Sequence, residues 1–448
     1  MPLALELAEF VAKAHFDDLP PLAIERAKMV IASTFASAAV GTGIDSARII
    51  RALAKERGGL QSSSIWFDGQ QVPVAEAARV NAMLSDAAAS DDSDIRNVAH
   101  IGTVAAAAAL ASAERTHASG HDLLTALALG YEVSARIGGA VNPGSLGFHA
   151  TVITIFAPCV ATAKLFGLSA TQTAHAIALA ATSTGGLGMS TNSWAREYHA
   201  GNSALLGVNA ALTARRGYEA QLDMLEAPRG YIATFGGTEG AEPVTRDLGS
   251  RWDIIDHIAF KLYPGAHPFH AVLEAAINAS KEGNVQPDDV ERIVVAGPRF
   301  RAQNAGWSAH PKDLAATIHS LPYYMAAGVA DKEFTWDHVS AEKVQRPVIS
   351  ALQERVSIDP EPQDMPALQW TWGGRVTIHT KSGRSYSSLV DASKGSGPRG
   401  VSWDEIDYKY RALMPAAGMS GARVEESLAA IKDLDKAPGI GELIRMLT

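Results

Sequence analysis

The chain has 448 residues, of which 47% are hydrophobic and 19% are charged, and its formal net charge is −9 at neutral pH. This length predicts about two to four domains, and the composition is that of a globular chain with a large core, which excludes disorder as the default state. The negative charge argues against nucleic acid as the main partner, although a local pocket of Lys and Arg side chains can still hold an anion.

The N-terminus and the cysteine content bear on location. The chain reaches Glu6 before any long apolar run, so we expect no signal or transit peptide and a cytoplasmic protein. The most apolar stretch, residues 102–113, is much shorter than the roughly 20 residues that cross a bilayer, so no membrane span is predicted. The single cysteine, Cys159, excludes an internal disulfide and a cysteine-based zinc site, and its apolar neighbours indicate a packed thiol.

From residue 3 to about residue 250 the chain is rich in good helix formers, which Gly and Pro residues separate into segments. Ser169 is a candidate N-cap for one helix, and Gly217 ends another. We predict a many-helix bundle with two loops that carry candidate site residues. The predicted helices cover residues 24–40, 46–57, 74–88, 102–116, 121–137, 174–181 and 202–216.

After Pro264 the pattern changes to short β-branched runs with turn residues between them. The predicted strands cover residues 290–296, 375–380 and 384–390, with a hairpin turn at 381–383 and helices at 267–282 and 320–330. This part therefore predicts a smaller α+β domain. A Gly/Pro/Ser-rich stretch at residues 394–400 closes it. Predicted helices at 403–414 and 423–432 then pack either on the first bundle or on the small domain.

Three carboxylates, Asp91, Asp92 and Asp94, stand at the end of a predicted helix. A solvated helix end is the plainest interpretation. Two sharper hypotheses are a magnesium site for a diphosphate substrate, as in the aspartate-rich motifs of helical terpenoid synthases, and carboxylates that orient a catalytic histidine. The magnesium motif needs one more acid a position later, where the chain has Ile95, so the sequence disfavours it.

His149 follows Phe148 and precedes small apolar residues, so we expect its ring at the N-terminus of a helix. There the helix dipole lowers the pKa of the imidazole and keeps it neutral, competent as a base or as a hydrogen-bond donor. The alternative is a buried core histidine with satisfied partners. The same two interpretations apply to His100, which stands just before Gly102.

Arg196 and Lys261 both lie among Gly, Pro and aromatic residues, where an ordinary solvated charge is not expected. The planar fork of Arg196 suits bidentate capture of a carboxylate. Lys261 suits a base or a proton donor if burial lowers its pKa. His267 and His270 have a possible metal-ligand spacing but no nearby acid, so we expect hydrogen bonding at a helix N-terminus rather than a metal site.

The order of five short blocks resembles the MmgE/PrpD family, and the resemblance covers nearly the whole chain. This family includes 2-methylcitrate dehydratases, cis-aconitate decarboxylases and iminodisuccinate epimerases. The blocks are Asp91-Asp92-Ser93 running to His100-Ile101-Gly102, Phe148-His149, His199-Ala200-Gly201-Asn202, Lys261-Leu262-Tyr263-Pro264, and His319-Ser320-Leu321-Pro322-Tyr323.

The resemblance implies a mainly α fold and a homodimer. It implies a large all-helical domain of residues 1–264 with 401–448, a smaller α+β domain of residues 265–400, and a cleft between the two. It also implies catalysis without a metal or an organic cofactor, by moving a proton at the carbon next to a carboxylate of a small di- or tricarboxylic acid. Carried over by motif, the catalytic residues are Asp91, His100, His149, Lys261 and Tyr323. The substrate-binding residues are Asp92, Arg196, His199, Asn202 and His267.

The chain departs from the family pattern at three positions: Ala89 stands in place of an Asp, Arg196 in place of a Lys, and Gly265 in place of a Cys. Because Arg stays protonated, we expect Arg196 to bind substrate while Lys261 or His149 removes the proton. Loss of a β-leaving group then gives a lyase, and reprotonation on the other face gives an epimerase. The competing hypotheses are a catalytically silent dimeric scaffold and, more distantly, a magnesium-dependent enzyme of prenyl diphosphates.

Overall fold

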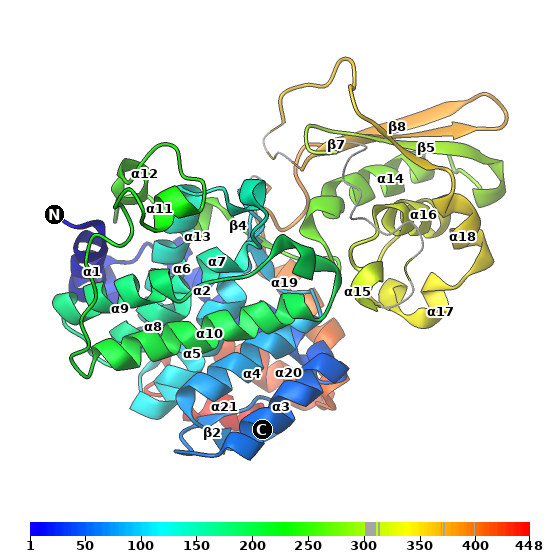
Figure 1. Cartoon of the computed structure of the whole chain (residues 1–448). Helices are drawn as coiled ribbons and strands as arrows, with labels where there is room; N and C mark the ends of the chain where they lie inside the picture. Colours follow the sequence, from blue (N-terminus) through cyan, green and yellow to red (C-terminus); the bar gives the residue numbers. More distant parts are fainter. Residues whose placement is uncertain (301–310, 312–313, 369, 371, 398) are drawn as a thin grey trace. The chain divides into compact units, whose positions relative to one another are not determined.

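The computed structural model describes residues 1–300, 311, 314–368, 370, 372–397 and 399–448. They form two compact units, residues 1–260 with 402–448 and residues 261–401, which Figure 1 shows coloured along the sequence. Helices dominate the first unit, and the second holds a small sheet with helices. The fold is therefore mainly α with a smaller α+β part, as predicted. The predicted domain boundaries, after residues 264 and 400, stay a prediction about independently folding domains.

The first unit is an alanine-rich helical bundle in which α4, α5, α8 and α10 pack on one another and α2 packs on α4 and α5. Capping boxes start several of its helices; Ser119 pairs with Asp122 before α6 and Ser169 with Gln172 before α9. The helices of the first part of this unit are α1 Leu3–Lys13, α2 Pro21–Gly41, α3 Asp45–Arg57, α4 Val74–Ala87, α5 Ile101–Thr116, α6 Gly120–Gly139, α7 Thr151–Thr154, α8 Phe156–Leu165, α9 Ala170–Thr182, α10 Ala195–Ala214, α11 Tyr231–Thr234, α12 Glu242–Thr245 and α13 Asp253–Asp256.

The prediction for α10 was wrong at its start. The helix begins at Ala195 rather than at residue 202, so the segment with Arg196 and His199 is helical and not a loop. Gly201 precedes the predicted start of the helix. It lies instead inside α10, where a Cβ would stand 2.4 Å from Met83 Cγ of α4, so glycine here permits close packing of the two helices.

Two short antiparallel pairs of strands, which the sequence did not predict, also belong to the first unit. The strands β1 Ser63–Ser64 and β2 Gln71–Val72 form one pair, and β3 Asp92–Asp94 and β4 Ile258–Phe260 form the other. In the second pair Asp92 lies opposite Phe260. The acidic segment is therefore a buried strand and not a solvated helix end. Lys261 follows β4 directly.

The C-terminal segment belongs to the first unit, which settles the alternative that the sequence left open. Its helices are α19 Trp403–Leu413, α20 Gly421–Lys432 and α21 Gly441–Met446, and α19 packs on α2. Lys409 of α19 is completely buried and donates to Ser33 Oγ of α2 at 2.7 Å. The two ends of the chain are thus joined in one core.

The second unit holds a four-stranded sheet in the order β6-β5-β7-β8, in which only β5 and β6 run parallel. Three of its strands were predicted, and β6, a short and partly exposed run, was missed. Helix α14 packs on β7 and β8, and Figure 1 shows it together with α16 on one face of the sheet. The strands are β5 Val290–Ala296, β6 Val356–Asp359, β7 Gly374–Thr380 and β8 Ser385–Val390. The helices are α14 His270–Glu282, α15 Leu314–Thr317, α16 Leu321–Asp331, α17 Ala341–Val344 and α18 Pro347–Gln353.

Three smaller predictions concern the turn, the closing stretch and Cys159. The predicted hairpin turn joins β7 to β8, with Gly383 at a φ of 81° that favours glycine. In the closing stretch Pro398 lies outside the described residues. Cys159 is buried on α8 and burial raises the pKa of its thiol, which agrees with a packed side chain.

The described helices differ from membrane-spanning helices in length or in composition. None of them is by itself long and apolar enough to cross a bilayer. Helices α2 and α3 reach the required length and composition only together, and the chain bends by 96° between them.

Candidate active site

Asp92 caps the helix that follows His100. Its carboxylate accepts the N–H groups of Gly102 and Thr103, each at 2.9 Å, at the N-terminus of α5. The side chain is 1% exposed, and a negative charge suits the positive end of the helix dipole. A Cβ at position 102 would stand 2.6 Å from Asp92 Oδ1, so only glycine leaves room for this cap. These contacts are those of a structural cap, and substrate binding by Asp92 stays a prediction.

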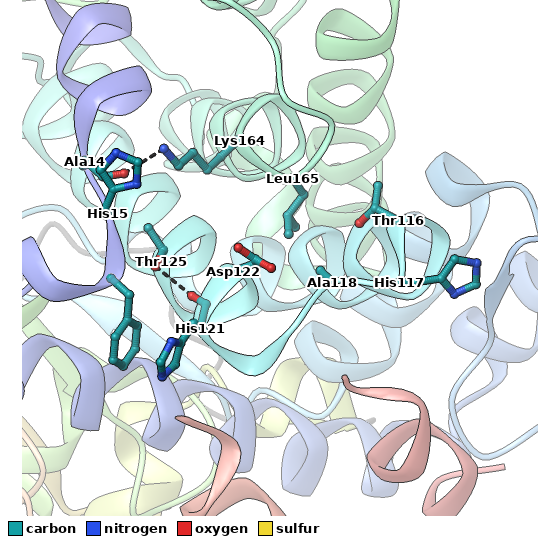
Figure 2. Close-up of a pocket in the computed structure, with 11 residues that line it drawn as sticks. Ala14, His15, Thr116, His117, Ala118, His121, Asp122, Thr125, Lys164 and Leu165 are labelled. Atoms are coloured by element: carbon teal, nitrogen blue, oxygen red, sulfur yellow. Dashed lines mark hydrogen bonds between the residues drawn. The ribbon is translucent and has the colours of Figure 1, made fainter. Parts of the chain in front are cut away.

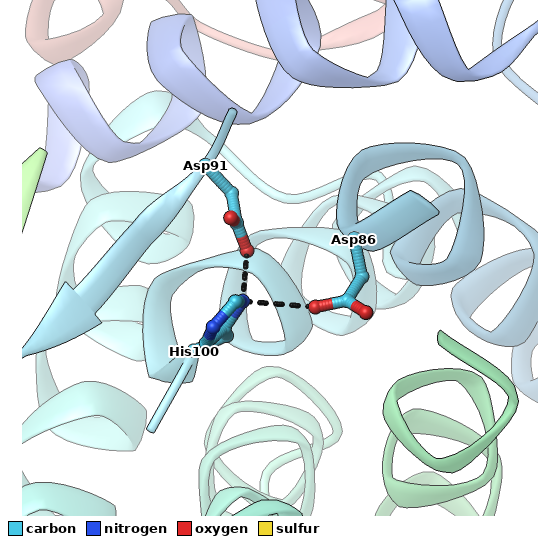
Figure 3. Close-up of side chains that lie close together, drawn as sticks. All are labelled: Asp86, Asp91 and His100. Atoms are coloured by element: carbon cyan, nitrogen blue, oxygen red, sulfur yellow. Dashed lines mark hydrogen bonds and ion pairs between the residues drawn. The ribbon is translucent and has the colours of Figure 1, made fainter. Parts of the chain in front are cut away.

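His100 is held by two carboxylates that approach the same ring nitrogen. Asp91 Oδ2 lies 2.7 Å from His100 Nδ1 and also accepts the hydroxyl of Thr103 at 2.9 Å. Asp86, from the last turn of α4, places its Oδ1 2.9 Å from the same nitrogen. Figure 3 shows the two acids converging on the ring from separate segments. Because carboxylates only accept, Nδ1 carries the proton, and a neutral His100 accepts a proton at Nε2.

Arg196 lies on the other side of Asp86. Its Nε is 3.3 Å from Asp86 Oδ2, and its Nη2 donates to the backbone carbonyl of Asp86 at 2.5 Å. Burial acts to raise the pKa of Asp86, but the charges of Arg196 and His100 outweigh it and hold the pKa at about 2. Asp86 is therefore a carboxylate. Two of the three guanidinium nitrogens of Arg196, Nε and Nη2, contact Asp86. The whole guanidinium fork is therefore not available for the expected bidentate capture of a substrate carboxylate.

His149 has the opposite proton arrangement to His100. Its Nδ1 accepts the backbone N–H of Thr151 at 3.2 Å, so a neutral His149 carries its proton on Nε2. Burial, followed by the positive charges of His100, Arg196 and His199, lowers the pKa of His149 to about 4, while Asp86 acts to raise it. The expected lowering is confirmed, but its main cause is burial and not the dipole of α7, which starts two residues later.

The other predicted residues of α10 differ in their surroundings. His199 stands one turn after Arg196, its ring centroid is 6.4 Å from that of His149, and burial lowers its pKa. One turn further along, Ser203 donates to the carbonyl of Thr151 and ties α10 to the segment after His149. Asn202 is half-buried on the same helix. The first unit thus brings together Asp91, His100, His149, Arg196 and His199.

Three predicted residues lie in the second unit. Lys261 is 1% exposed, and His267 is completely buried with its Nε2 3.5 Å from Ser393 Oγ. Tyr323 is also completely buried, and its hydroxyl donates to the backbone carbonyl of His338, while burial raises its pKa. A phenol with these properties suits an anchor for α16. The catalytic role of Tyr323 stays a prediction.

Asp86 was missed from the sequence, although a signal was present. It is the only charge in the run from Ala82 to Ala89, and a lone charge in an apolar helix end implies a buried partner. Its partners His100 and Arg196 are 14 and 110 residues further along the chain. No local pattern identifies such partners, so only the folded chain reveals the cluster.

A divalent cation is one possible occupant of this cluster. Asp86, Asp91 and His100 offer ligand atoms that all lie within 4.8 Å of one another, and oxygen and imidazole ligands suit such an ion. Coordination would require His100 to lose the Nδ1 proton that both carboxylates accept. It would also place the ion near the guanidinium of Arg196, which already balances Asp86. The observed contacts therefore fit a hydrogen-bonded charge cluster better than a metal site.

A polar hollow of about 300 Å³ lies elsewhere in the first unit, and Figure 2 shows its lining. Its charged groups already have structural partners. Lys164 Nζ donates to the carbonyls of Val11, Ala12 and Ala14, and Asp122 belongs to the capping box of α6. This hollow lacks the uncommitted charge that would recognise a substrate carboxylate.

Comparison with known proteins gives two family matches and several relatives. The MmgE/PrpD N-terminal domain matches residues 5–243, and the MmgE/PrpD C-terminal domain matches residues 263–434. A cis-aconitate decarboxylase of Homo sapiens is 25% identical over 439 residues, 95% of this chain and 90% of that protein. A cis-aconitate decarboxylase of Aspergillus terreus is 25% identical over 470 residues, 99% of this chain and 95% of that protein. One of Mus musculus is 24% identical over 445 residues, 95% and 89% of the two chains.

Proposed function

Because the chain belongs to the MmgE/PrpD family and is a lyase of that family, we propose that it acts on a small di- or tricarboxylic acid by moving a proton at the carbon next to a carboxylate, without a cofactor. One observation carries this proposal. Two buried carboxylates hold the Nδ1 proton of His100, so the basic lone pair of the neutral ring is at Nε2, and we assign the proton exchange with substrate to that nitrogen.

The proton positions of the two histidines support different roles. His100 accepts the proton from carbon at Nε2, and His149 donates its Nε2–H to the oxygen on which enolate charge develops. The sequence left Lys261 or His149 as the base, and the tautomer of His149 favours the donor role instead. Lys261 stays an alternative base. Arg196 Nη1, which has no protein partner among the described residues, holds a carboxylate of the substrate.

The carbanion next to a carboxylate is common to the three reaction classes, which differ in how it forms and what it does. After proton removal, departure of a β-leaving group gives dehydration, and return of the proton to the other face gives epimerisation. In decarboxylation, loss of a carboxyl group as carbon dioxide leaves the electron pair, and protonated His100 delivers a proton to the carbon next to a carboxylate. The relatives are named cis-aconitate decarboxylases, so cis-aconitate is the first substrate to test. We also propose that the enzyme is a homodimer in the cytoplasm. Sedimentation of the full chain at about twice its monomer mass would support the dimer.

The test of the proposed function is proton NMR of the purified full chain in deuterated water with cis-aconitate, 2-methylcitrate and iminodisuccinate. We expect deuterium to enter next to a carboxylate of at least one acid, and the accompanying product separates lyase from epimerase. Activity that survives a chelator would remove the magnesium alternative. No exchange and no turnover with any of the three acids would contradict the proposal and favour the silent scaffold.

Variants of two histidines test the assignment of the base. His100→Gln is expected to lower exchange by about 100-fold or more, because general acid–base catalysis contributes on the order of 10²–10⁴. His175→Gln is the matched control, since His175 lies on α9 and its hydrogen bonds to the described residues are with the backbone of Ala220. A folded His100→Gln enzyme with wild-type exchange would contradict the role of His100.

A further inference from the structure

Asp86 occupies a position that is unfavourable for an acid. It lies in the last turn of α4, where a carboxylate faces the negative end of the helix dipole, and this turn contains no basic residue. The residue is also 2% exposed, so its charge has lost most of its hydration. A charge retained against both effects needs compensation from nearby groups of opposite sign.

Two groups supply that compensation, one at each oxygen: the Nδ1–H of His100 and the guanidinium of Arg196. Oδ1 lies 2.9 Å from His100 Nδ1, and Oδ2 lies 3.3 Å from Arg196 Nε. Oδ2 is buried and makes no hydrogen bond to the described residues, so its interaction with Arg196 is one of charge. Asp86 is therefore shared between the proposed base and an arginine, and neither of these two side chains has the carboxylate to itself.

Other charged and titratable groups lie near Asp86, His100 and Arg196 and contribute to the charge balance of this cluster. Asp91 beside β3 contacts the same nitrogen of His100. Glu197 on α10 lies 3.8 Å from Arg196 Nε and accepts the hydroxyl of Ser46. His149 precedes α7, and His199 lies on α10. Lys409 of α19 reaches the backbone carbonyl of Asp91 at 3.4 Å.

We propose that Asp86 is a positioning residue that holds the Nδ1 proton of His100 and shares its charge between His100 and Arg196. Its role in catalysis rests on the proposed function, whereas the coupling itself does not. Asp86 favours the protonated form of His100 by attraction. Arg196 opposes that form, because it draws on the same carboxylate and carries a like charge. Removing Asp86 should therefore lower the titration midpoint of His100, and removing Arg196 should raise it.

The experiment follows the His100 ring in the folded full chain without substrate. Long-range proton–nitrogen NMR of protein with labelled histidine reports the tautomer and the titration midpoint, and His100→Gln assigns the signal. Asp86→Asn is expected to lower the midpoint by about one pH unit or more, the usual effect of losing an adjacent opposite charge. Arg196→Gln is expected to raise it. Asp94→Asn is the matched control, because Asp94 is a buried acid paired with Arg96 and is expected to leave the midpoint nearly unchanged.

Activity gives a second readout. In the enzyme with a substrate identified by exchange, the acid limb of kcat/KM should move to lower pH in Asp86→Asn by the same amount as the NMR midpoint. If Asp86→Asn does not fold, Arg196→Gln alone carries the test, since a general loss of structure does not predict a raised midpoint. The double variant of both residues removes the two opposite charges together and is expected to be more stable than Arg196→Gln alone.

The two proposals fail in different ways. An unmoved midpoint in Asp86→Asn, or shifts of the same sign in Asp86→Asn and Arg196→Gln, would overturn the role of Asp86 even if the enzyme turns over a carboxylic acid. Opposite shifts without turnover of any acid would overturn the proposed function and leave the coupling in place.

Discussion

His149 and His100 show how the same side chain acquires different chemistry from its partners. The partner that sets the tautomer of His149 is a backbone N–H two residues later, whereas the partners of His100 include Asp86 from another helix. The first arrangement is local and agrees with the expectation of a neutral ring at a helix start. The second depends on tertiary packing. A sequence therefore identifies candidate histidines more readily than it assigns the proton on each ring.

The lowered pKa of His149 predicts a contribution to stability that depends on pH. Between the ordinary value near 6.5 and the folded value of about 4, the unfolded chain binds a proton that the folded chain does not. Stability therefore falls as the pH falls through this window. We expect the wild type to lose about 1–2 kcal/mol more unfolding free energy than His149→Gln between pH 8 and pH 5.

Denaturant unfolding at the two pH values measures this effect. At pH 8 the ring of His149 is neutral in the folded and in the unfolded chain. The difference in unfolding free energy between wild type and His149→Gln at this pH therefore reports the packing and the hydrogen bond that the substitution removes. Only the further change in this difference between pH 8 and pH 5 reports protonation of the ring. Equal losses in both proteins would contradict the buried, neutral ring.

At the scale of elements, the start of α5 connects the acidic segment to the site. Asp92 of β3 caps this helix, β3 is held by its pairing with β4, and His100 lies at the junction between strand and helix. The position of His100 thus depends on a helix cap and on a strand pair that joins residues about 165 positions apart in sequence. Helical periodicity predicted α5 but contained no information about the strand that orients its first turn.

Glycine at position 102 gives a prediction about this junction. In Gly102→Ala the new methyl group would meet the buried Asp92 carboxylate and displace it from the two N–H groups of the cap. We expect a loss of about 1–3 kcal/mol of unfolding free energy and a lower Tm, in the usual range for overpacking a buried site.

Gly421→Ala is the matched control for this prediction. Gly421 also stands at a helix N-terminus, that of α20, and a Cβ there would meet nothing within 4 Å. Its Tm should stay at or slightly above the wild-type value, because alanine is the better helix former. Thermal unfolding followed by circular dichroism compares the variants, and equal Tm values would show that the cap does not depend on the glycine.

At the scale of the whole molecule, the first unit is discontinuous in sequence. The second unit, residues 261–401, separates its two segments by 141 residues. Helix α19 brings the buried Lys409 next to Ser33 and the backbone of Asp91. The C-terminal segment therefore supports the acidic segment of the site, although it contributes none of the predicted catalytic residues. Residues near both chain ends depend on each other for a complete core.

Lys409→Met tests this dependence. The substitution keeps the apolar stem but removes the buried donor, so we expect a loss of about 1–3 kcal/mol of unfolding free energy. We also expect lower turnover, because the Asp91 segment loses a hydrogen-bond donor. The matched control is Lys436→Met in the same segment. The side chain of Lys436 is 74% exposed and forms an ion pair with Asp433 at the surface, so its loss should cost within about 0.5 kcal/mol. Equal stability of the two variants would contradict a supporting role for Lys409.

The sequence by itself determined most of the secondary structure and the fold class. Alanine-rich periodic segments form helices wherever they can bury one face, and alternating β-branched runs such as residues 290–296 form strands, because both patterns act over a few residues. Five short motifs in order were enough to indicate the family. The short strands β3 and β6 escaped prediction, since each depends on pairing with a segment distant in sequence.

Only the tertiary structure decided how the charged residues of the site are used. It placed Arg196 on a helix against Asp86, turned Asp92 into a helix cap, and brought Asp86 to His100. It also assigned the C-terminal helices to the first unit. Charges interact over a few ångströms whatever their separation along the chain. The partner of a buried acid is therefore a property of packing, and no local pattern contains it.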